Sequence, residues 1–297
     1  MCRKGIWAAV PGLVLAVSAL CGYAPAGAAV AARQAVETTK VAEGVYTFRH
    51  VNHRNMFVVT AEGVIATDPI NTAAAKAMMG EIRKITDKPI KYVVYSHEHW
   101  DHARGGKIFK EAGAQFVAQE RCVTAWKSHL HPDADVVMPD VTFRDRHTLT
   151  LGGTTLDLYY FGPNHGQCLT VMHLPKERLV FVVDLVVPKR IGLRGWTTTD
   201  PGAAARTMRE IEKLSFDRFI PGHGPAVAPV SDMRDVRQYV EDLIAAVREA
   251  FEKHKSVAKV RENAKDIKLP KYEKWTGYKE YLQGNVERVI TYYWNGQ

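Results

Sequence analysis

Residues 90–102 read IKYVVYSHEHWDH and join a strand pattern to a cluster of metal-binding residue types. The first part is rich in β-branched, aromatic and other apolar residues, which is typical of a buried strand. Three histidines and an aspartate then follow, His97, His99, Asp101 and His102. On an extended chain, the i, i+2 spacing places the first three of these side chains on one side.

Grouping these side chains costs free energy through dehydration and charge repulsion unless a cation compensates. Neutral imidazole and carboxylate are suitable donors for zinc or iron. A solvated loop that happens to contain histidines is the alternative interpretation. The cluster therefore predicts a divalent metal site at the end of a buried strand.

The segment resembles the H-x-H-x-D-H signature of the metallo-β-lactamase superfamily, because HEHWDH matches it at every fixed position. The resemblance extends from about Val45 to Pro225, with the same order of elements. It includes three later motifs, which are GPNHGQC with His165, FVVDL with Asp184, and PGHG with His223. In the last motif, the flanking glycines let the backbone bring the histidine ring inward.

The resemblance implies two divalent ions, zinc first, with iron and manganese as alternatives. One ion is expected on His97, His99 and His165. The other is expected on Asp101, His102 and His223. Asp184 is expected to bridge both ions, which looks more like the glyoxalase II branch than like the many β-lactamases that use cysteine or lack the bridge.

Two ions held in this way lower the pKa of a shared water to give hydroxide near neutral pH, so no side-chain nucleophile is needed. Asp101 is the candidate catalytic residue, because a carboxylate there can orient the hydroxide or move a proton to the leaving group. Asp68, at the end of GVIATD, resembles the acidic residue that supports the ligand loop. An ordinary turn aspartate is the alternative for that position.

Candidate substrate contacts lie near these motifs, with plain surface as the alternative for each. They are His53 between the first strands, Asn164 beside a ligand, and Lys189, Arg190, Arg194 and Trp196 after Asp184.

The expected fold is α/β, the four-layer αβ/βα metallo-β-lactamase sandwich with a C-terminal helical extension. Residues 29–297 are expected to form a single domain, with a core at about 41–230 and helices at about 231–297. Asn71 and Thr72 are predicted to cap a helix that runs through Lys84. Asp200 and Pro201 are predicted to open a second helix that runs to about Lys213. The Tyr- and Trp-rich tail from Lys271 has helical spacing, which favours core packing or a docking surface.

Residues 1–28 have the layout of a cleaved secretory signal, with Arg3 and Lys4 before an apolar run and small residues. A retained membrane anchor, a lipoprotein signal at Cys21 and a buried helix are the alternatives. Cleavage predicts a periplasmic or secreted protein without stable membrane insertion. It leaves only Cys122 and Cys168, and the sequence does not decide whether they pair.

The formal charge of +8 falls to about +6 without the signal, and acidic residues are interspersed among the basic ones. This distribution argues against nucleic-acid binding and weakly favours anionic small-molecule substrates. No oligomeric state is predicted.

The leading prediction is an exported dinuclear hydrolase of a small ester, thioester, lactone or amide. Hydrolysis of β-lactam antibiotics is the alternative within the same class. Iron-dependent oxidation of thiols or persulfides and a non-catalytic binding role are the alternatives from other classes.

Overall fold

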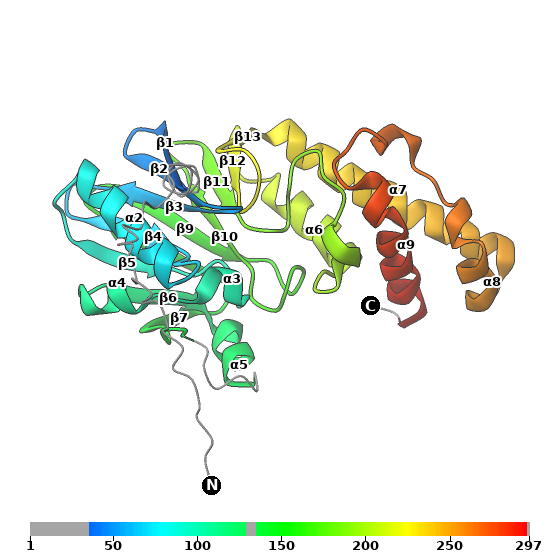
Figure 1. The fold of residues 1–297 in the computed structure, drawn as a ribbon, viewed down its shortest axis with the longest axis horizontal. Helices are drawn as coiled ribbons and strands as arrows, with labels where there is room; N and C mark the ends of the chain where they lie inside the picture. Colours follow the sequence, from blue (N-terminus) through cyan, green and yellow to red (C-terminus); the bar gives the residue numbers. More distant parts are fainter. Residues whose placement is uncertain (1–35, 129–134, 296–297) are drawn as a thin grey trace, which may run out of the picture. The chain divides into compact units, whose positions relative to one another are not determined.

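Two β-sheets and two layers of helices make up the described part of the chain in the computed structural model, which covers residues 36–128 and 135–295 (Figure 1). The predicted signal peptide, residues 1–28, lies outside the described residues. The chain divides between Gln34 and Ala35, and the fold below belongs to the second unit.

The first sheet has its strands in sequence order, antiparallel from β1 to β4 and parallel from β4 to β7. The strands are β1 (Val36–Ala42), β2 (Val45–His50), β3 (His53–Val59), β4 (Val64–Thr67), β5 (Ile90–Val94), β6 (Gln115–Gln119) and β7 (Val141–Phe143). The sequence did not predict β1, because its polar pattern, VETTKVA, has little of the apolar content of a buried strand.

The second sheet has the order β13-β12-β11-β10-β9-β8, in which only the β11 and β12 pair is parallel among the described strands. Its strands are β8 (Arg146–Leu151), β9 (Thr154–Tyr160), β10 (Thr170–Leu174), β11 (Leu179–Val182), β12 (Arg218–Pro221) and β13 (Ala228–Pro229).

The predicted caps occur as expected, since the side chains of Asn71 and Asp200 accept hydrogen bonds from Ala74 and Ala203. The helices are α2 (Thr72–Ile85), α3 (Trp100–Ala103), α4 (Lys107–Glu111), α5 (Glu120–Ser128), α6 (Pro201–Ile211), α7 (Val230–His254), α8 (Val257–Glu262) and α9 (Tyr278–Asn295). Short 3-10 turns are η1 (Leu193–Trp196), η2 (Ala264–Asp266) and η3 (Pro270–Tyr272). Among the described helices, none has both the length and the apolar content needed to cross a membrane.

Successive side chains along each strand point to opposite faces of the sheet, and this alternation explains the four layers. Ile65 of β4 packs between the sheets, whereas Val64 and Ala66 face α2. In β11, Phe181 packs between the sheets, and Val180 and Val182 face the helices on the other side. Side chains at successive strand positions point to opposite faces, so both sheets bury both faces. This arrangement confirms the predicted αβ/βα sandwich.

The C-terminal helices extend the hydrophobic core on the outer face of the second sheet, to which Tyr239, Tyr272 and Val289 belong. The final helix begins at Tyr278, so the prediction of a helix from Lys271 was wrong for its first turns. Pro270 begins a separate 3-10 turn there. Most of the aromatic tail is core packing, but Trp294 is 67% exposed.

The two cysteines of the described chain form a disulfide between Cys122 of α5 and Cys168 before β10. Both residues are fully buried. The disulfide therefore joins the helix layer of the first sheet to a segment that leads into the second sheet.

Candidate metal centre

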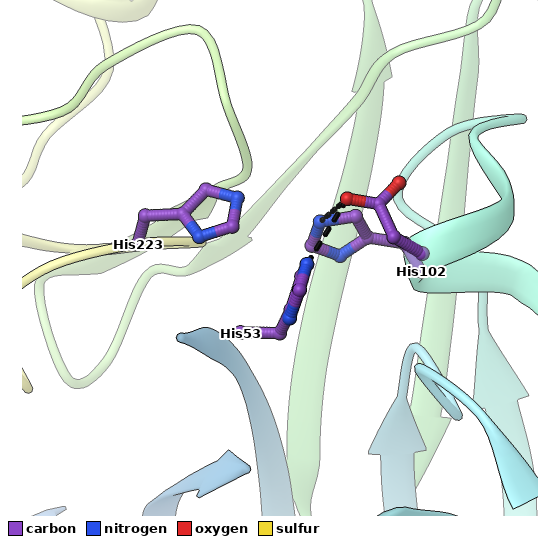
Figure 2. A group of neighbouring side chains, drawn as sticks. His53, His102 and His223 are labelled. Carbon is purple, nitrogen blue, oxygen red and sulfur yellow. Dashed lines mark hydrogen bonds and ion pairs between the residues drawn. The ribbon is translucent and has the colours of Figure 1, made fainter. Parts of the chain in front are cut away.

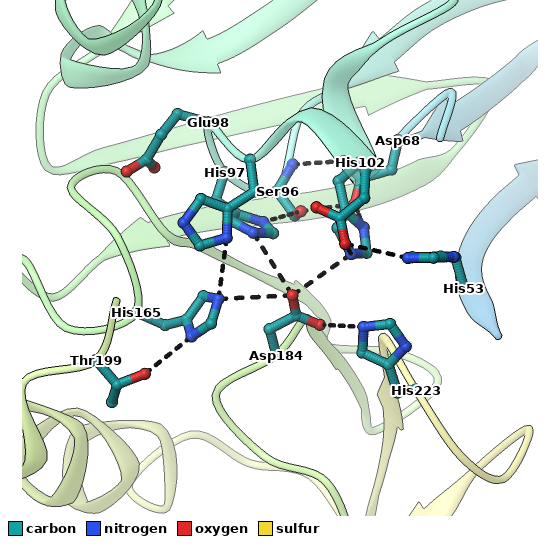
Figure 3. Close-up of polar contacts among 12 residues, drawn as sticks. His53, Asp68, Ser96, His97, Glu98, His102, His165, Asp184, Thr199 and His223 are labelled. Carbon is teal, nitrogen blue, oxygen red and sulfur yellow. Dashed lines mark hydrogen bonds and ion pairs between the residues drawn. The ribbon is translucent and has the colours of Figure 1, made fainter. Parts of the chain in front are cut away.

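Loops that follow strands of both sheets bring histidines and aspartates to one edge of the sandwich (Figure 3). His97 follows β5 in the first sheet. Asp184 and His223 follow β11 and β12, which are parallel neighbours in the second sheet. Because the carboxyl ends of parallel strands meet at one edge, these two side chains are adjacent.

The seven predicted ligands all lie in two neighbouring groups of donor atoms, and within each group the atoms are no more than 4.8 Å apart. One group is His97, His99, His165 and Asp184, and the other is His53, Asp101, His102 and His223.

The segment HWDH is not extended, which corrects the predicted side for Asp101. His99 precedes α3, and Asp101 lies in the first turn of that helix. The turn directs Asp101 away from His97 and His99 and into the second group.

Asp184 stands between the two groups. Its Oδ2 atom lies 3.6 Å from Nε2 of His97 and 3.5 Å from Nε2 of His165. The same oxygen is 3.5 Å from Nε2 of His102, and Oδ1 is 2.9 Å from Nε2 of His223. The carboxylate thus faces histidines of both groups, as expected of a bridging ligand.

The backbone around Asp184 is adapted to this position. Asp184 has φ of 59°, a left-handed conformation that aspartate tolerates better than most residues. A Cβ atom at Gly222 would lie 2.9 Å from Oδ1 of Asp184 and 2.6 Å from Cγ1 of Val183. Glycine before His223 therefore lets the two ligand loops approach each other.

Polar partners hold the ring nitrogens that face away from the centre. The Nδ1 atoms of His97, His165 and His223 lie 2.9 Å from Oγ of Ser96, 3.0 Å from Oγ1 of Thr199 and 2.6 Å from the carbonyl oxygen of Asn52. Such outer partners fix the orientation and tautomer of a metal-binding imidazole.

Asp68 contacts both the loop after β5 and a histidine of the second group. It is fully buried, and its carboxylate accepts hydrogen bonds from the backbone N–H and the hydroxyl of Ser96, at 2.7 and 2.6 Å. Its Oδ2 atom is also 3.2 Å from Nδ1 of His102. One carboxylate therefore orients both the loop after β5 and a histidine of the second group.

The inward-facing nitrogens fit a metal ion. Nε2 of His97 and Nε2 of His102 are buried without a hydrogen-bond partner among the described residues, which is costly unless another group satisfies them. The carbonyl of Asn52 can only accept, so Nδ1 of His223 is the donor. A neutral His223 ring would present a lone pair to Asp184, and either a metal ion or a proton on Nε2 removes this repulsion.

Electrostatics at the centre also favour positive charge. Burial lowers the pKa of His97 well below its ordinary value, so its ring is neutral as a ligand must be. Burial also opposes a charge on His102, but the Asp184 and Asp68 carboxylates together outweigh it and raise the pKa of His102 well above the ordinary range. The carboxylates thus attract the positive charge that a divalent ion would supply.

A cavity of about 900 Å³ opens over the centre. Its wall includes Leu185, Ile191, Leu193 and Trp196 together with Arg190. The Nε atom of Arg190 is buried with no hydrogen-bond partner in the described structure. The cavity therefore combines an apolar wall with the guanidinium-bearing side chain of Arg190.

The helix α9 holds one side of this cavity in place. The amide of Asn285 donates to the carbonyl of Gly192 at 3.0 Å, and Nε of Arg288 donates to the carbonyl of Thr199 at 2.8 Å. The C-terminal extension thus supports the loop that contains Arg190 and Trp196.

The whole of residues 51–223 matches the family model described as the metallo-beta-lactamase superfamily. The chain belongs to the metallo-beta-lactamase superfamily. The solved metallo-beta-lactamase from Pontibacter korlensis has the same fold, with a TM-score of 0.61 and 22% identity over 69% of this chain and 99% of that chain.

Three superfamily relatives differ in their chemistry. The chain is 24% identical to the linear primary-alkylsulfatase of a Pseudomonas strain, over 79% of this chain and 54% of that protein. It is 27% identical to the 2,4-dinitroanisole O-demethylase subunit alpha of a Nocardioides strain, over 63% of this chain and 57% of that protein. It is 23% identical to the metallo-beta-lactamase type 2 of Bacteroides fragilis, over 64% of this chain and 79% of that protein. The chain spans little more than half the length of the first two. The glyoxalase II-like branch stays a prediction.

Only some of the residues predicted to contact substrate line the cavity. Arg190, Trp196 and His53 line the cavity. Asn164 does not reach the described cavity wall, because it is 2% exposed and its side chain bonds to Gly162, Thr207 and the N–H of His165. Lys189 instead pairs with Asp232 and Asp235. The Arg194 side chain lies outside the described part of the structure.

Sequence reasoning missed two features of this superfamily centre. Glu98, inside the HEHWDH motif, is buried, and its carboxylate accepts a hydrogen bond from the N–H of Gln167 at 2.6 Å. It therefore ties the first histidine motif to the segment after His165. His53 was predicted only as a substrate contact, whereas the structure also places it in the second group of donor atoms.

Proposed function

We propose that the chain is a hydrolase with two divalent metal ions, zinc in the first place. The position of Asp184 between two histidine groups carries this proposal, because one carboxylate that faces both groups suits a pair of adjacent ions. The proposed ligands are His97, His99 and His165 for one ion, and Asp101, His102 and His223 for the other. When bound, the ions would supply a hydroxide near neutral pH and polarise the scissile bond.

Asp101 is the proposed catalytic residue among the side chains. Its carboxylate is 52% exposed at the cavity, and its Oδ2 atom lies 3.0 Å from Nε2 of His53. Although burial opposes its charge, the His53 hydrogen bond and other partners lower the pKa of Asp101 to about 2. Asp101 is therefore ionised at neutral pH and can orient an attacking water or relay its proton.

The cavity wall supports a substrate that has both an apolar and an anionic part. Leu193 and Trp196 would contact the apolar part, and Arg190 would pair with the anionic part. We propose a small ester, thioester, lactone or amide of this kind. A sulfate ester is a second candidate, because the cavity offers the same features to a sulfate with an apolar chain and one relative is a linear primary-alkylsulfatase.

β-Lactam hydrolysis is retained as the alternative within this class, since one relative is a metallo-beta-lactamase type 2. Thiol or persulfide oxidation uses a single iron and can do without most donors of a second metal site. Here the second group, with Asp101, His102 and His223, is complete. That complete second group favours the hydrolytic proposal.

We also propose that the protein is exported to the periplasm or secreted. The pattern of residues 1–28 supports this location, and so does the disulfide between Cys122 and Cys168, because disulfides persist in oxidising compartments.

A substrate panel tests the proposed reaction. Zinc-loaded protein is assayed with anionic and neutral thioesters, lactones, carboxylic esters, alkyl sulfates and a β-lactam. We expect hydrolysis of at least one anionic substrate and its loss, by about 100-fold or more, in Asp184→Asn. Asp217→Asn is the matched control, because Asp217 is an exposed carboxylate paired with Arg178. Full activity in Asp184→Asn, or no hydrolysis across the panel by protein with two zinc ions, would overturn the proposal.

A further inference from the structure

His53 belongs to the second group of possible metal-donor atoms. Unlike the other three members of that group, it stands in none of the superfamily motifs. It is the first residue of β3, directly after the turn that joins β2 to β3. No signature motif contains this turn, and the residue reaches the centre only because the hairpin lies beside the edge where His102 and His223 emerge (Figure 2).

The distances around His53 suit a shared ion. Its Nε2 atom is 3.0 Å from Oδ2 of Asp101, and that oxygen is 3.9 Å from Nε2 of His102. Two donor atoms on one zinc ion lie about 3 to 4 Å apart, because each bond is about 2 Å long. The His53 ring also packs edge to face against the rings of His223 and His102, with centroids 4.9 and 5.4 Å apart.

The hairpin holds both histidines of this side. The carbonyl of Asn52 accepts a hydrogen bond from Nδ1 of His223 at 2.6 Å, so the residue before His53 fixes the ring of His223. His53 and His223 are thus positioned by one short segment, and each directs a nitrogen toward Asp101 or Asp184 (Figure 3).

We propose that His53 is an additional ligand of the second metal ion, beside Asp101, His102 and His223. This inference rests on the proposed dinuclear centre. It gives each ion three imidazole ligands, with Asp184 between them. An imidazole-rich second site favours zinc over manganese, which prefers oxygen donors.

Cadmium substitution tests the proposal directly, because cadmium has a spin-half isotope whose scalar coupling to imidazole ring protons identifies each bound histidine. In the wild-type protein loaded with two cadmium ions, we expect three coupled histidines on each cadmium signal. If His53 only hydrogen-bonds to Asp101, the second signal couples to two histidines, His102 and His223, and the proposal is wrong.

A variant and its matched control strengthen the assignment. His53→Ala should leave the first cadmium signal unchanged and remove one histidine coupling from the second. His50→Ala should change neither signal, because His50 pairs with His53 across the hairpin but belongs to neither donor group. If His53→Ala does not fold, the wild-type coupling count still decides the question.

The spectrum also separates this inference from the proposed function. Three couplings on the second signal with no hydrolysis of any substrate would retain His53 as a ligand and reject the hydrolase. Two couplings in a protein that hydrolyses its substrate would reject His53 as a ligand and retain the hydrolase.

Discussion

At the scale of single residues, Asp68 shows how a buried carboxylate organises the centre without facing the cavity. It accepts hydrogen bonds from Ser96 and contacts Nδ1 of His102. We expect Asp68→Asn to weaken binding of the second zinc ion by about 10- to 100-fold, because an amide orients the imidazole less well. Competition with a chromophoric chelator measures this change. Unaltered affinity for both ions would show that Asp68 only stabilises the turn.

Some residue positions at the candidate site could be predicted from the sequence, and others could not. The gathering of the seven proposed ligands at one edge could be predicted because each stands in a short motif near a strand end. The side taken by Asp101 could not, because the prediction assumed an extended chain and α3 begins at Trp100. His53 and Glu98 owe their positions to contacts with segments distant in sequence, which local spacing does not contain.

At the scale of elements, α9 controls the cavity from outside it. Asn285 is fully buried and donates to the carbonyl of Gly192, beside Arg190 and η1. We expect Asn285→Ala to raise KM several-fold and to change kcat less, because the loop proposed to contact substrate loses its support while the proposed metal ligands stay in place. Steady-state kinetics on the best substrate of the panel check this split. A fall in kcat at constant KM would contradict it.

The disulfide between Cys122 and Cys168 is the second feature at this scale. It closes a segment of 46 residues between α5 and the approach to β10. We expect reduction to lower the free energy of unfolding by about 2–4 kcal/mol, as for other disulfides. Urea unfolding with and without a reductant measures the difference. Cys122→Ala/Cys168→Ala is the control, since its stability should not respond to the reductant, and an equal response of both proteins would exclude the disulfide as the cause.

The elements themselves were mostly predictable. Strong apolar patterns predicted the central strands, and Asn71 and Asp200 predicted two helix starts. The strand β1 was not predicted, because its pairing with β2 and not its own composition makes it a strand. The pairing of the two cysteines was equally open, since it depends on how α5 packs.

At the scale of the whole molecule, the candidate metal centre joins the two sheets. His97 follows a strand of the first sheet, while Asp184 and His223 follow strands of the second. We expect chelation to destabilise the fold, by about 2.7 kcal/mol relative to protein with free metal at a hundred times its dissociation constant. Thermal unfolding with and without chelator measures this change. Identical midpoints would mean that the groups at this edge do not bind metal in the folded protein.

The sandwich could be anticipated at this scale because motif order and strand order agreed with one fold. The cavity could not be anticipated, because its wall is assembled from segments that are distant in sequence. These segments are the loop after Asp184, η1 and the turn before β3. The helix α9 holds the loop after Asp184 in place. We therefore expect substrate preference to depend on contacts between distant segments more than on the motifs.

Reconstitution with counted zinc tests the dinuclear hydrolase most directly. Chelated protein is titrated with zinc while bound metal per chain and hydrolysis of the best substrate are followed together. We predict that activity is absent without metal and reaches its maximum at two zinc ions per chain. Activity that survives chelation, or full activity at one ion per chain, would contradict the dinuclear centre.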